Sequence, residues 1–280
     1  MTIDETFRLG GDLPVRRLGF GAMRLTGPQI WGPPTDRDAA IRVARRAVEL
    51  GITFIDTADA YGPGSNEELL AEALHPYPEG LVIGTKAGQS RPAPGRWVPL
   101  GRPEYLRQQC ELSLRRLRLE RIDLFQLHRV DPKVPLADQI GALADLRTEG
   151  KIAHIGLSEV TVAQLKQAQR IVPIVSVQNM YNLRDRAWED VLRYCEGQGI
   201  AFIPWLPIAR GEHARPDGPL GTVAKELAET PARVALAWLL RHSPVMVPIP
   251  GTSSVAHLED NAGADRVRLT DEQYHRLSQL

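Results

Sequence analysis

Four residues in the first half of the chain have side chains that together can deliver a proton: Asp56, Tyr61, Lys86 and His128. Each stands at or just beyond the C-terminal end of a short apolar run, namely TFIDT, LVIGTK or DLFQLH. A charged lysine beside a phenol lowers the pKa of the phenol, a carboxylate keeps the lysine charged, and an imidazole can orient a carbonyl oxygen. We therefore predict a proton-donating site, provided that the fold brings the ends of these runs together.

Short apolar runs alternate with amphipathic helical segments along all 280 residues. The expected strands are 17–20, 53–56, 81–85, 123–127, 152–157, 174–178, 200–204 and 245–249. The expected helices are 37–50, 66–74, 103–118, 137–149, 161–171, 187–197 and 231–241. This alternation, without a break in composition, predicts one α/β domain over residues 1–280, a (β/α)₈ TIM barrel. The C-terminal ends of barrel strands open onto one face, so the four candidate residues should meet there.

The segments outside this alternation should close the bottom of the barrel and shape its top. FRLGGDLPVRRLG predicts an N-terminal β-hairpin that turns at Gly10 and Gly11 and lies across the bottom of the barrel. Three irregular stretches, 24–36, 87–102 and 206–222, are expected to be loops over the C-terminal face, where substrate pockets are built.

The composition excludes several classes of protein. The 34 basic residues balance the 34 acidic ones, so no overall field favours nucleic acid or an anionic membrane. Cys110 and Cys195 lie far apart with no disulfide or metal spacing, which favours a reducing, cytoplasmic setting. The N-terminus has no apolar signal region, and no run reaches the roughly 18 apolar residues of a membrane helix. We expect a soluble cytoplasmic protein that acts on a small molecule, with no metal and no obligate protein partner.

The segment DTADAYG at 56–62, followed by Lys86 and His128, resembles the aldo-keto reductase family, and the resemblance extends over most of the chain. It implies an oxidoreductase that reduces an aldehyde or ketone to an alcohol with a nicotinamide cofactor. In that interpretation Tyr61 donates the proton, Asp56 holds Lys86 charged so that Tyr61 becomes acidic enough near neutral pH, and His128 orients the carbonyl oxygen. Taken one at a time, the same residues fit a polar loop, a snorkelling lysine and a structural histidine.

GFGAM at 19–23 is not a Rossmann fingerprint, because Arg24 stands where the third glycine should be. The resemblance instead implies that Gly21, Ala22 and Met23 line the nicotinamide side of the pocket. It also implies that Trp205 stacks on the nicotinamide ring. Glu159 stands where the family usually has an asparagine, and Tyr181 fits either the pocket or the core. The other residues that the resemblance places at the cofactor are Asp56, Ser158, Gln178, Leu206, Pro207, Ile208, Gly211, Gly251, Thr252, Ser253, Ser254, His257, Asp260 and Asn261.

The segment IPGTSSVAHLEDNAG resembles the part of the family that binds the 2′-phosphate and adenine of NADPH, with hydroxyls at a helix N-terminus. Gly251 and His257 stand where many members carry a lysine and an arginine. NADPH is therefore the expected cofactor, and NADH is the alternative.

Within the family, GAMRLTGP, WGPP and VALAWLL are most similar to the bacterial pyridoxal reductase branch, which implies reduction of pyridoxal to pyridoxine. The residues expected to bind the substrate are Trp31, Tyr61, Trp97, His128 and Arg129. Two other functions remain open at this point. One is a redox-sensing subunit that binds the nicotinamide cofactor with little turnover, and the other is a metal-dependent barrel hydrolase.

Overall fold

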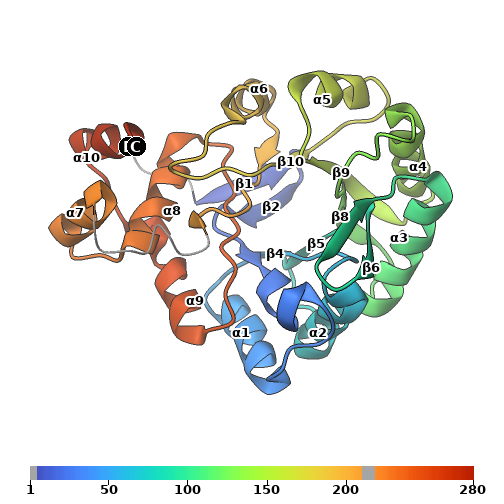
Figure 1. Cartoon of the computed structure of the whole chain (residues 1–280), viewed down its shortest axis with the longest axis horizontal. Coiled ribbons are helices and arrows are strands. Elements are labelled where there is room, and N and C mark those ends of the chain that lie inside the picture. The colour runs from blue at the N-terminus through green and yellow to red at the C-terminus, as the bar shows by residue number, and fades with distance from the viewer. Residues whose placement is uncertain (1–4, 210–217) are drawn as a thin grey trace.

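The computed structural model describes residues 5–209 and 218–280, and a curved parallel sheet with helices along its outer side dominates it (Figure 1). Seven strands form this sheet in the order β11-β10-β9-β8-β5-β4-β3, and every neighbouring pair is parallel. The strands are β3 (Phe20–Gly21), β4 (Phe54–Asp56), β5 (Val82–Ala87), β8 (Ile122–Leu127), β9 (Ile152–Ser158), β10 (Ser176–Gln178) and β11 (Ala201–Phe202). The prediction of a TIM-barrel-like α/β fold is confirmed.

The expected strand at 245–249 is instead an extended segment that hydrogen-bonds to the strands at both ends of the sheet. On one side, Phe202 N–H donates to Val245 O over 2.8 Å and accepts at its carbonyl from Val247 N–H over 2.8 Å. On the other side, Gly19 N–H donates to Pro248 O over 3.0 Å. A regular ladder does not form because Pro248 and Pro250 have no N–H to donate. These prolines are visible in the sequence, and they argue against an ordinary strand there.

The predicted N-terminal hairpin is confirmed. It comprises β1 (Thr6–Leu9) and β2 (Leu13–Arg16), and Gly10 and Gly11 turn it with φ values of 62° and 89°. These positive φ values cost a glycine little because it has no Cβ. Leu9 and Val15 are buried in one apolar cluster with residues at the starts of the barrel strands, which include Phe54 and Val82. The hairpin therefore covers the N-terminal end of the barrel, opposite the face where the candidate residues stand.

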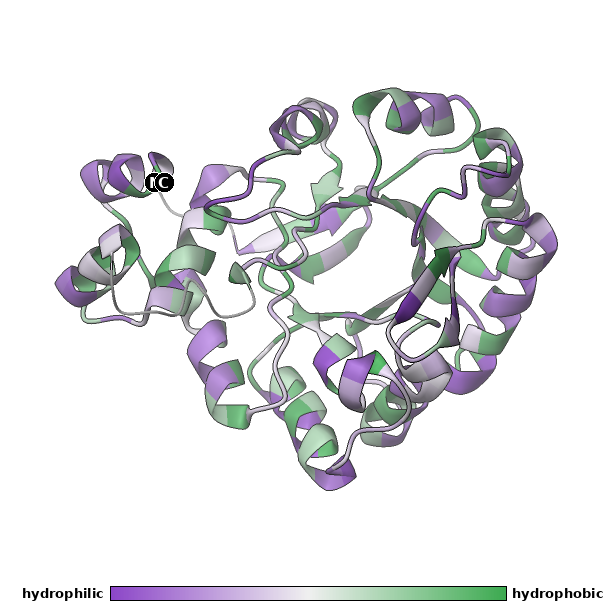
Figure 2. Cartoon of the chain, in the orientation of Figure 1, coloured by the Kyte–Doolittle hydropathy of each residue, from purple (hydrophilic) through white to green (hydrophobic). Residues whose placement is uncertain are grey.

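All seven expected helices are present, with ends within two residues of the prediction. They are α1 (Arg37–Glu49), α2 (Ser65–Leu74), α3 (Pro103–Leu117), α4 (Leu136–Thr148), α5 (Val162–Gln169), α6 (Glu189–Gln198) and α8 (Pro231–His242). Their caps follow the sequence: Thr161 forms a capping box with Gln164, and Thr230 accepts from Arg233 N–H over 3.2 Å. Figure 2 shows the green apolar side of these helices turned toward the sheet and the purple polar side turned outward.

Two of the expected loops contain regular structure. The stretch 87–102 holds an antiparallel hairpin of β6 (Gln89–Ala93) and β7 (Arg96–Pro99), and 206–222 overlaps the start of α7 (Gly218–Leu227). The hairpin lacks an alternating apolar pattern because neither face enters the main core, so periodicity did not reveal it. Two further helices, α9 (Val255–Ala262) and α10 (Asp271–Ser278), follow the extended segment at 245–250.

Candidate active site

Lys86 is the centre of the predicted catalytic group, and its side chain is fully buried. Its Nζ atom donates to Asp56 Oδ2 over 2.6 Å, to the carbonyl oxygen of Thr57 over 2.8 Å and to Tyr61 OH over 3.5 Å. The sheet produces this contact because β4 and β5 are adjacent and parallel, with Asp56 paired to Gly84. The structure therefore brings Asp56, Tyr61 and Lys86 together as the sequence predicts.

Two glutamines hold the other oxygen of Asp56. Gln178 Nε2 donates to Asp56 Oδ1 over 2.8 Å, and Gln126 Nε2 donates to the same atom over 3.3 Å. Gln178 was expected at the nicotinamide carboxamide, and its contact with Asp56 was not anticipated. Gln126 was missed altogether, although it is a polar residue in an apolar strand, which is the signal that marks a buried contact. Asp56 is thus fixed from two sides in an orientation that favours Lys86.

His128 and Trp97 complete the wall around Tyr61. The rings of Tyr61 and His128 meet edge to face with centroids 5.8 Å apart, and Trp97 lies 6.4 Å from each of them. The backbone N–H of His128 donates to the carbonyl oxygen of Ala87 over 2.8 Å, which places His128 beside the end of β5. The predicted four residues therefore share one site, and Trp97 from β7 stands over it.

The charges in this site favour a lysine that is charged and a tyrosine that keeps its proton. Burial lowers the pKa of Lys86, but Asp56 and Tyr61 outweigh burial, and the pKa lies above its ordinary value. Burial raises the pKa of Tyr61, and Lys86 offsets this only in part. Lys86 lowers the pKa of Tyr61 as expected, but in the free protein burial outweighs that effect. Tyr61 is protonated at neutral pH, as a proton donor must be.

His128 is neutral in this environment. Burial lowers its pKa well below the usual value, and the positive charges of Lys86, Arg129 and Arg91 lower it further. Its Nδ1 atom is buried and has no hydrogen-bond partner within the described part of the chain. A neutral imidazole carries one N–H donor, so His128 can hydrogen-bond a carbonyl oxygen without competing with Tyr61 as the acid.

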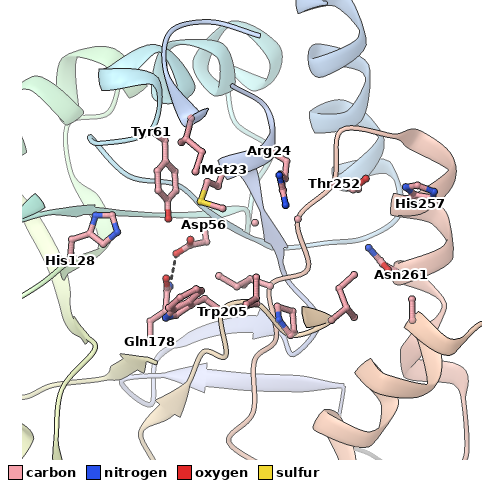
Figure 3. A pocket seen from close by; sticks show the side chains of 18 of the residues that line it. Met23, Arg24, Asp56, Tyr61, His128, Gln178, Trp205, Thr252, His257 and Asn261 are labelled. Atoms are coloured by element: carbon pink, nitrogen blue, oxygen red, sulfur yellow. Dashed lines mark hydrogen bonds between the residues drawn. The ribbon is translucent and has the colours of Figure 1, made fainter. Parts of the chain in front are cut away.

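A cavity of about 880 Å³ runs from this group to the far side of the barrel mouth (Figure 3). Tyr61 and His128 lie at one end of the view, and Thr252, His257 and Asn261 lie at the other. Its lining includes the predicted residues Gly21, Met23, Asp56, Tyr61, Trp97, His128, Arg129, Gln178, Trp205, Leu206, Pro207, Ile208, Gly251, Thr252, His257, Asp260 and Asn261. The predicted site is therefore largely one continuous pocket, within the range of about 300–1,000 Å³ that is usual for ligand sites.

Some predicted residues do not line this cavity. Ser158 is buried and accepts from Arg129 Nη1 over 3.0 Å, and Ser254 is the N-cap of α9. Trp31 packs against Arg91, whose guanidinium carbon lies 5.6 Å from the ring centroid of Trp31. Ala22 is buried beside the cavity, and Ser253 is exposed outside it. Gly211 lies outside the described residues. Tyr181 belongs to the core, where its hydroxyl contacts Glu189 and His242.

Arg24 is the main cavity residue that the sequence reasoning missed. It is exposed and lines the cavity, and its guanidinium has no hydrogen bond or ion pair with any described residue. A Cβ added to Gly251 would meet the carbonyl oxygen of Gly21 at 2.8 Å and Arg24 Cγ at 3.6 Å. A side chain at position 251 would therefore force the backbone apart, and Arg24 occupies the adjacent space. The position of Arg24 directly after GFGAM could have indicated a place at the pocket. In the sequence, Arg24 stood out only as the residue that breaks the Rossmann pattern.

The far end of the cavity carries further polar contacts. Asp260 Oδ2 accepts from Thr230 Oγ1 over 2.7 Å, and Asp260 Oδ1 forms an ion pair with Arg233 Nε at 3.0 Å, so much of the carboxylate is already engaged. Asn261 is buried and lines the cavity, and Thr230, at the start of α8, lines it as well. The sequence predicts a helix that begins at residue 231, but it did not indicate that Thr230 and Pro231 line the pocket.

Comparison with known proteins identifies the family. The model of the aldo/keto reductase family matches residues 17–280. The chain belongs to the aldo/keto reductase family. It is therefore an oxidoreductase of the alcohol–carbonyl couple that uses NAD(P)H, and the interpretation as a metal-dependent hydrolase is wrong.

Two proteins with similar sequences and one solved structure show what this chain is similar to. An uncharacterized oxidoreductase of Schizosaccharomyces pombe is 52% identical over 96% of this chain and 88% of the relative. Pyridoxine 4-dehydrogenase of Escherichia coli is 42% identical over 96% of this chain and 95% of the relative. An aldo/keto reductase of Klebsiella pneumoniae, solved with NADP and acetate, is 25% identical with a TM-score of 0.82 over 99% of this chain and 95% of that chain. All three carry the names of enzymes, which gives no support to a redox-sensing subunit.

The described residues contain no helix long and apolar enough to cross a membrane.

Proposed function

We propose that this aldo/keto reductase uses NADPH to reduce an aldehyde, with pyridoxal as the substrate and pyridoxine as the product. The observation that carries the proposal is the buried Lys86, whose Nζ atom contacts both Asp56 and Tyr61 where they line the cavity. The 42% identity to pyridoxine 4-dehydrogenase supports the choice of substrate. We further propose that the chain acts as a single domain in the cytoplasm without an obligate partner.

The cofactor supplies a hydride to the carbonyl carbon when it is bound. Tyr61 donates its hydroxyl proton to the carbonyl oxygen, and the ammonium of Lys86 stabilises the phenolate that remains. Asp56, held by Gln178, keeps that ammonium charged and in place. His128 donates a hydrogen bond from its neutral ring to the same carbonyl oxygen and so fixes its orientation.

The chemistry of the cavity lining suits a nicotinamide dinucleotide. Trp205 offers an aromatic face next to the catalytic end, as Figure 3 shows, and Thr252 and Asn261 offer polar groups at the other end. Arg24 stands between these regions as a guanidinium without a described partner, which suits a phosphate group. We assign Arg24 to the phosphates of the cofactor, in place of the lysine that is missing at Gly251.

The substrate end of the cavity suits a flat ring that carries an anionic oxygen. Trp97 provides an aromatic wall beside Tyr61, and the guanidinium of Arg91 stacks on its ring at 3.6 Å and fixes it. Arg129 lines the same end, where its charge can meet an oxygen anion. Pyridoxal has a flat ring that can pack on Trp97, an aldehyde that can meet Tyr61, and an adjacent hydroxyl that ionises readily and can meet Arg129.

A substrate panel tests this proposal. The purified protein is mixed with NADPH and with pyridoxal, simple aldehydes or sugars, and the loss of NADPH absorbance is followed. We expect the highest kcat/KM with pyridoxal. A protein that binds NADPH but oxidises it with none of these compounds would contradict the proposed reaction.

A further inference from the structure

Glu159 lies in a tight turn directly after β9, at the position where the family usually has an asparagine. Its φ is 55°, and its backbone N–H donates to the carbonyl oxygen of Gln178 over 3.1 Å. The next residue, Val160, is held through both backbone groups by the side chain of Asn179, over 3.1 Å and 2.9 Å. The turn is therefore well fixed, and the direction in which the Glu159 side chain leaves it is fixed as well.

The carboxylate of Glu159 joins two neighbouring segments. Its Oε1 atom accepts from the indole Nε1 of Trp205 over 2.6 Å and from Met180 N–H over 2.7 Å. Met180 follows β10 and Trp205 follows β11, and the two residues form a parallel bridge with each other. One oxygen atom thus ties the Trp205 side chain to the backbone of the adjacent segment.

The contact between Glu159 and Trp205 restricts the rotation of the Trp205 side chain. Its backbone is already held, because Trp205 N–H donates to Asn179 O over 3.2 Å and Trp205 O accepts from Tyr181 N–H over 3.3 Å. The indole ring can still rotate about its side-chain bonds, and a hydrogen bond at Nε1 selects one orientation of the ring plane. The guanidinium carbon of Arg129 lies 5.9 Å from the ring centroid, and Trp205 lines the cavity.

We propose that Glu159 is a positioning residue for Trp205: its carboxylate sets the plane of the indole ring against which the nicotinamide packs. This rests on the proposed function, in which the nicotinamide end of the cofactor lies at Trp205. An asparagine at position 159 has a side chain one carbon shorter, so the glutamate gives this chain a contact with Trp205 that the usual residue would not reach. The entropy of the indole ring is then already reduced before the cofactor binds, so less entropy is lost on binding and the affinity is higher.

Two substitutions at position 159 separate the effect of side-chain length from the effect of charge. Glu159→Gln keeps the length and an acceptor oxygen, whereas Glu159→Asp keeps the charge, tolerates the positive φ and is one carbon shorter. Each is combined with Trp205→Phe, which keeps an aromatic face but has no N–H donor. The dissociation constant of NADPH is measured without substrate, and thermal melting shows that each variant is folded.

We expect Glu159→Asp to raise the dissociation constant about 3- to 10-fold, the scale of one hydrogen bond. Glu159→Gln should stay within about twofold of the unchanged protein, because its oxygen still accepts from Trp205. In the Trp205→Phe background, Glu159→Asp should have almost no further effect, since the donor is already gone.

Equal effects of Glu159→Asp in both backgrounds would overturn the proposal, because Glu159 would then act independently of Trp205. A Glu159→Gln variant as weak as Glu159→Asp would also overturn it, because charge rather than position would matter. A separate Trp205→Ala variant tests the premise. If its affinity for NADPH is unchanged, the nicotinamide does not pack on Trp205. In that case the proposed cofactor site is wrong, independently of what Glu159 does.

Discussion

Replacement of Lys86 by methionine tests the catalytic group most severely, because it removes one charge from the centre of a buried network. The ammonium lies 3.5 Å from the hydroxyl oxygen of Tyr61. At an effective dielectric constant of about 20, a unit charge at this distance stabilises a phenolate by about 5 kcal/mol. Without that charge the effect of burial on Tyr61 is less opposed, so the pKa of Tyr61 should rise further above its ordinary value. We expect kcat to fall by about 10³-fold or more.

The same substitution has a second effect that must be separated from the first. Asp56 is only 2% exposed, and without Lys86 the amides of Gln126 and Gln178 are the side-chain donors left to its carboxylate among the described residues. Loss of one partner of a buried ion pair costs about 3–5 kcal/mol of stability. The double variant Asp56→Asn with Lys86→Met carries no charge at either of these two buried positions and should regain much of that stability while its turnover stays low.

The assay combines urea unfolding with single-turnover oxidation of bound NADPH. Retention of a tenth or more of the original rate by Lys86→Met would refute this reasoning, since a neutral side chain would then serve as well as the ammonium. A double variant that regained activity along with stability would refute it as well, because the lysine would then be merely structural.

Three further outcomes follow from the site and its surroundings. Arg24→Met should raise the dissociation constant of NADPH by about tenfold or more, the scale of a lost charge-assisted hydrogen bond; an unchanged constant by calorimetry would show that Arg24 does not meet a phosphate. Trp97→Ala should raise KM for pyridoxal by about 3- to 10-fold and leave NADPH affinity intact, and a change confined to NADPH affinity would place Trp97 on the wrong ligand. Burial lowers the pKa of His242 below that of the unfolded chain, so stability should fall as pH drops below about 6.5; urea midpoints between pH 8 and pH 5 should fall less in His242→Gln than in the unchanged chain.

The grouping of Asp56 with Lys86 was predictable because it follows from strand order. Asp56 and Lys86 stand at the ends of two consecutive strands, and consecutive parallel strands in a barrel are neighbours. The helix boundaries were predictable for a similar reason, since caps such as Thr161 and Thr230 act within one turn of the chain. Both kinds of signal are local or follow directly from the alternating pattern.

The contacts that were missed depend on separations along the chain that no local pattern reports. Gln178 reaches Asp56 across 122 positions, and Glu159 reaches Trp205 across 46. The absence of an unusually low pKa at Tyr61 is also a property of the packed site, because burial opposes the effect of Lys86. Arg24 was missed because its place in the cavity depends on the close approach of Gly251 to Gly21, two residues that lie far apart in the sequence.

The most direct test of the account is Tyr61→Phe, because this change removes the hydroxyl to which Lys86 donates and no contact assigned to the cofactor. The measurement is the rate of NADPH oxidation with saturating pyridoxal, together with the dissociation constant of NADPH. The account predicts a fall in kcat of about 10²-fold or more, the scale of general acid catalysis, with cofactor affinity within about twofold of the unchanged protein. Turnover near that of the unchanged protein would contradict the assignment of Tyr61 as the proton donor.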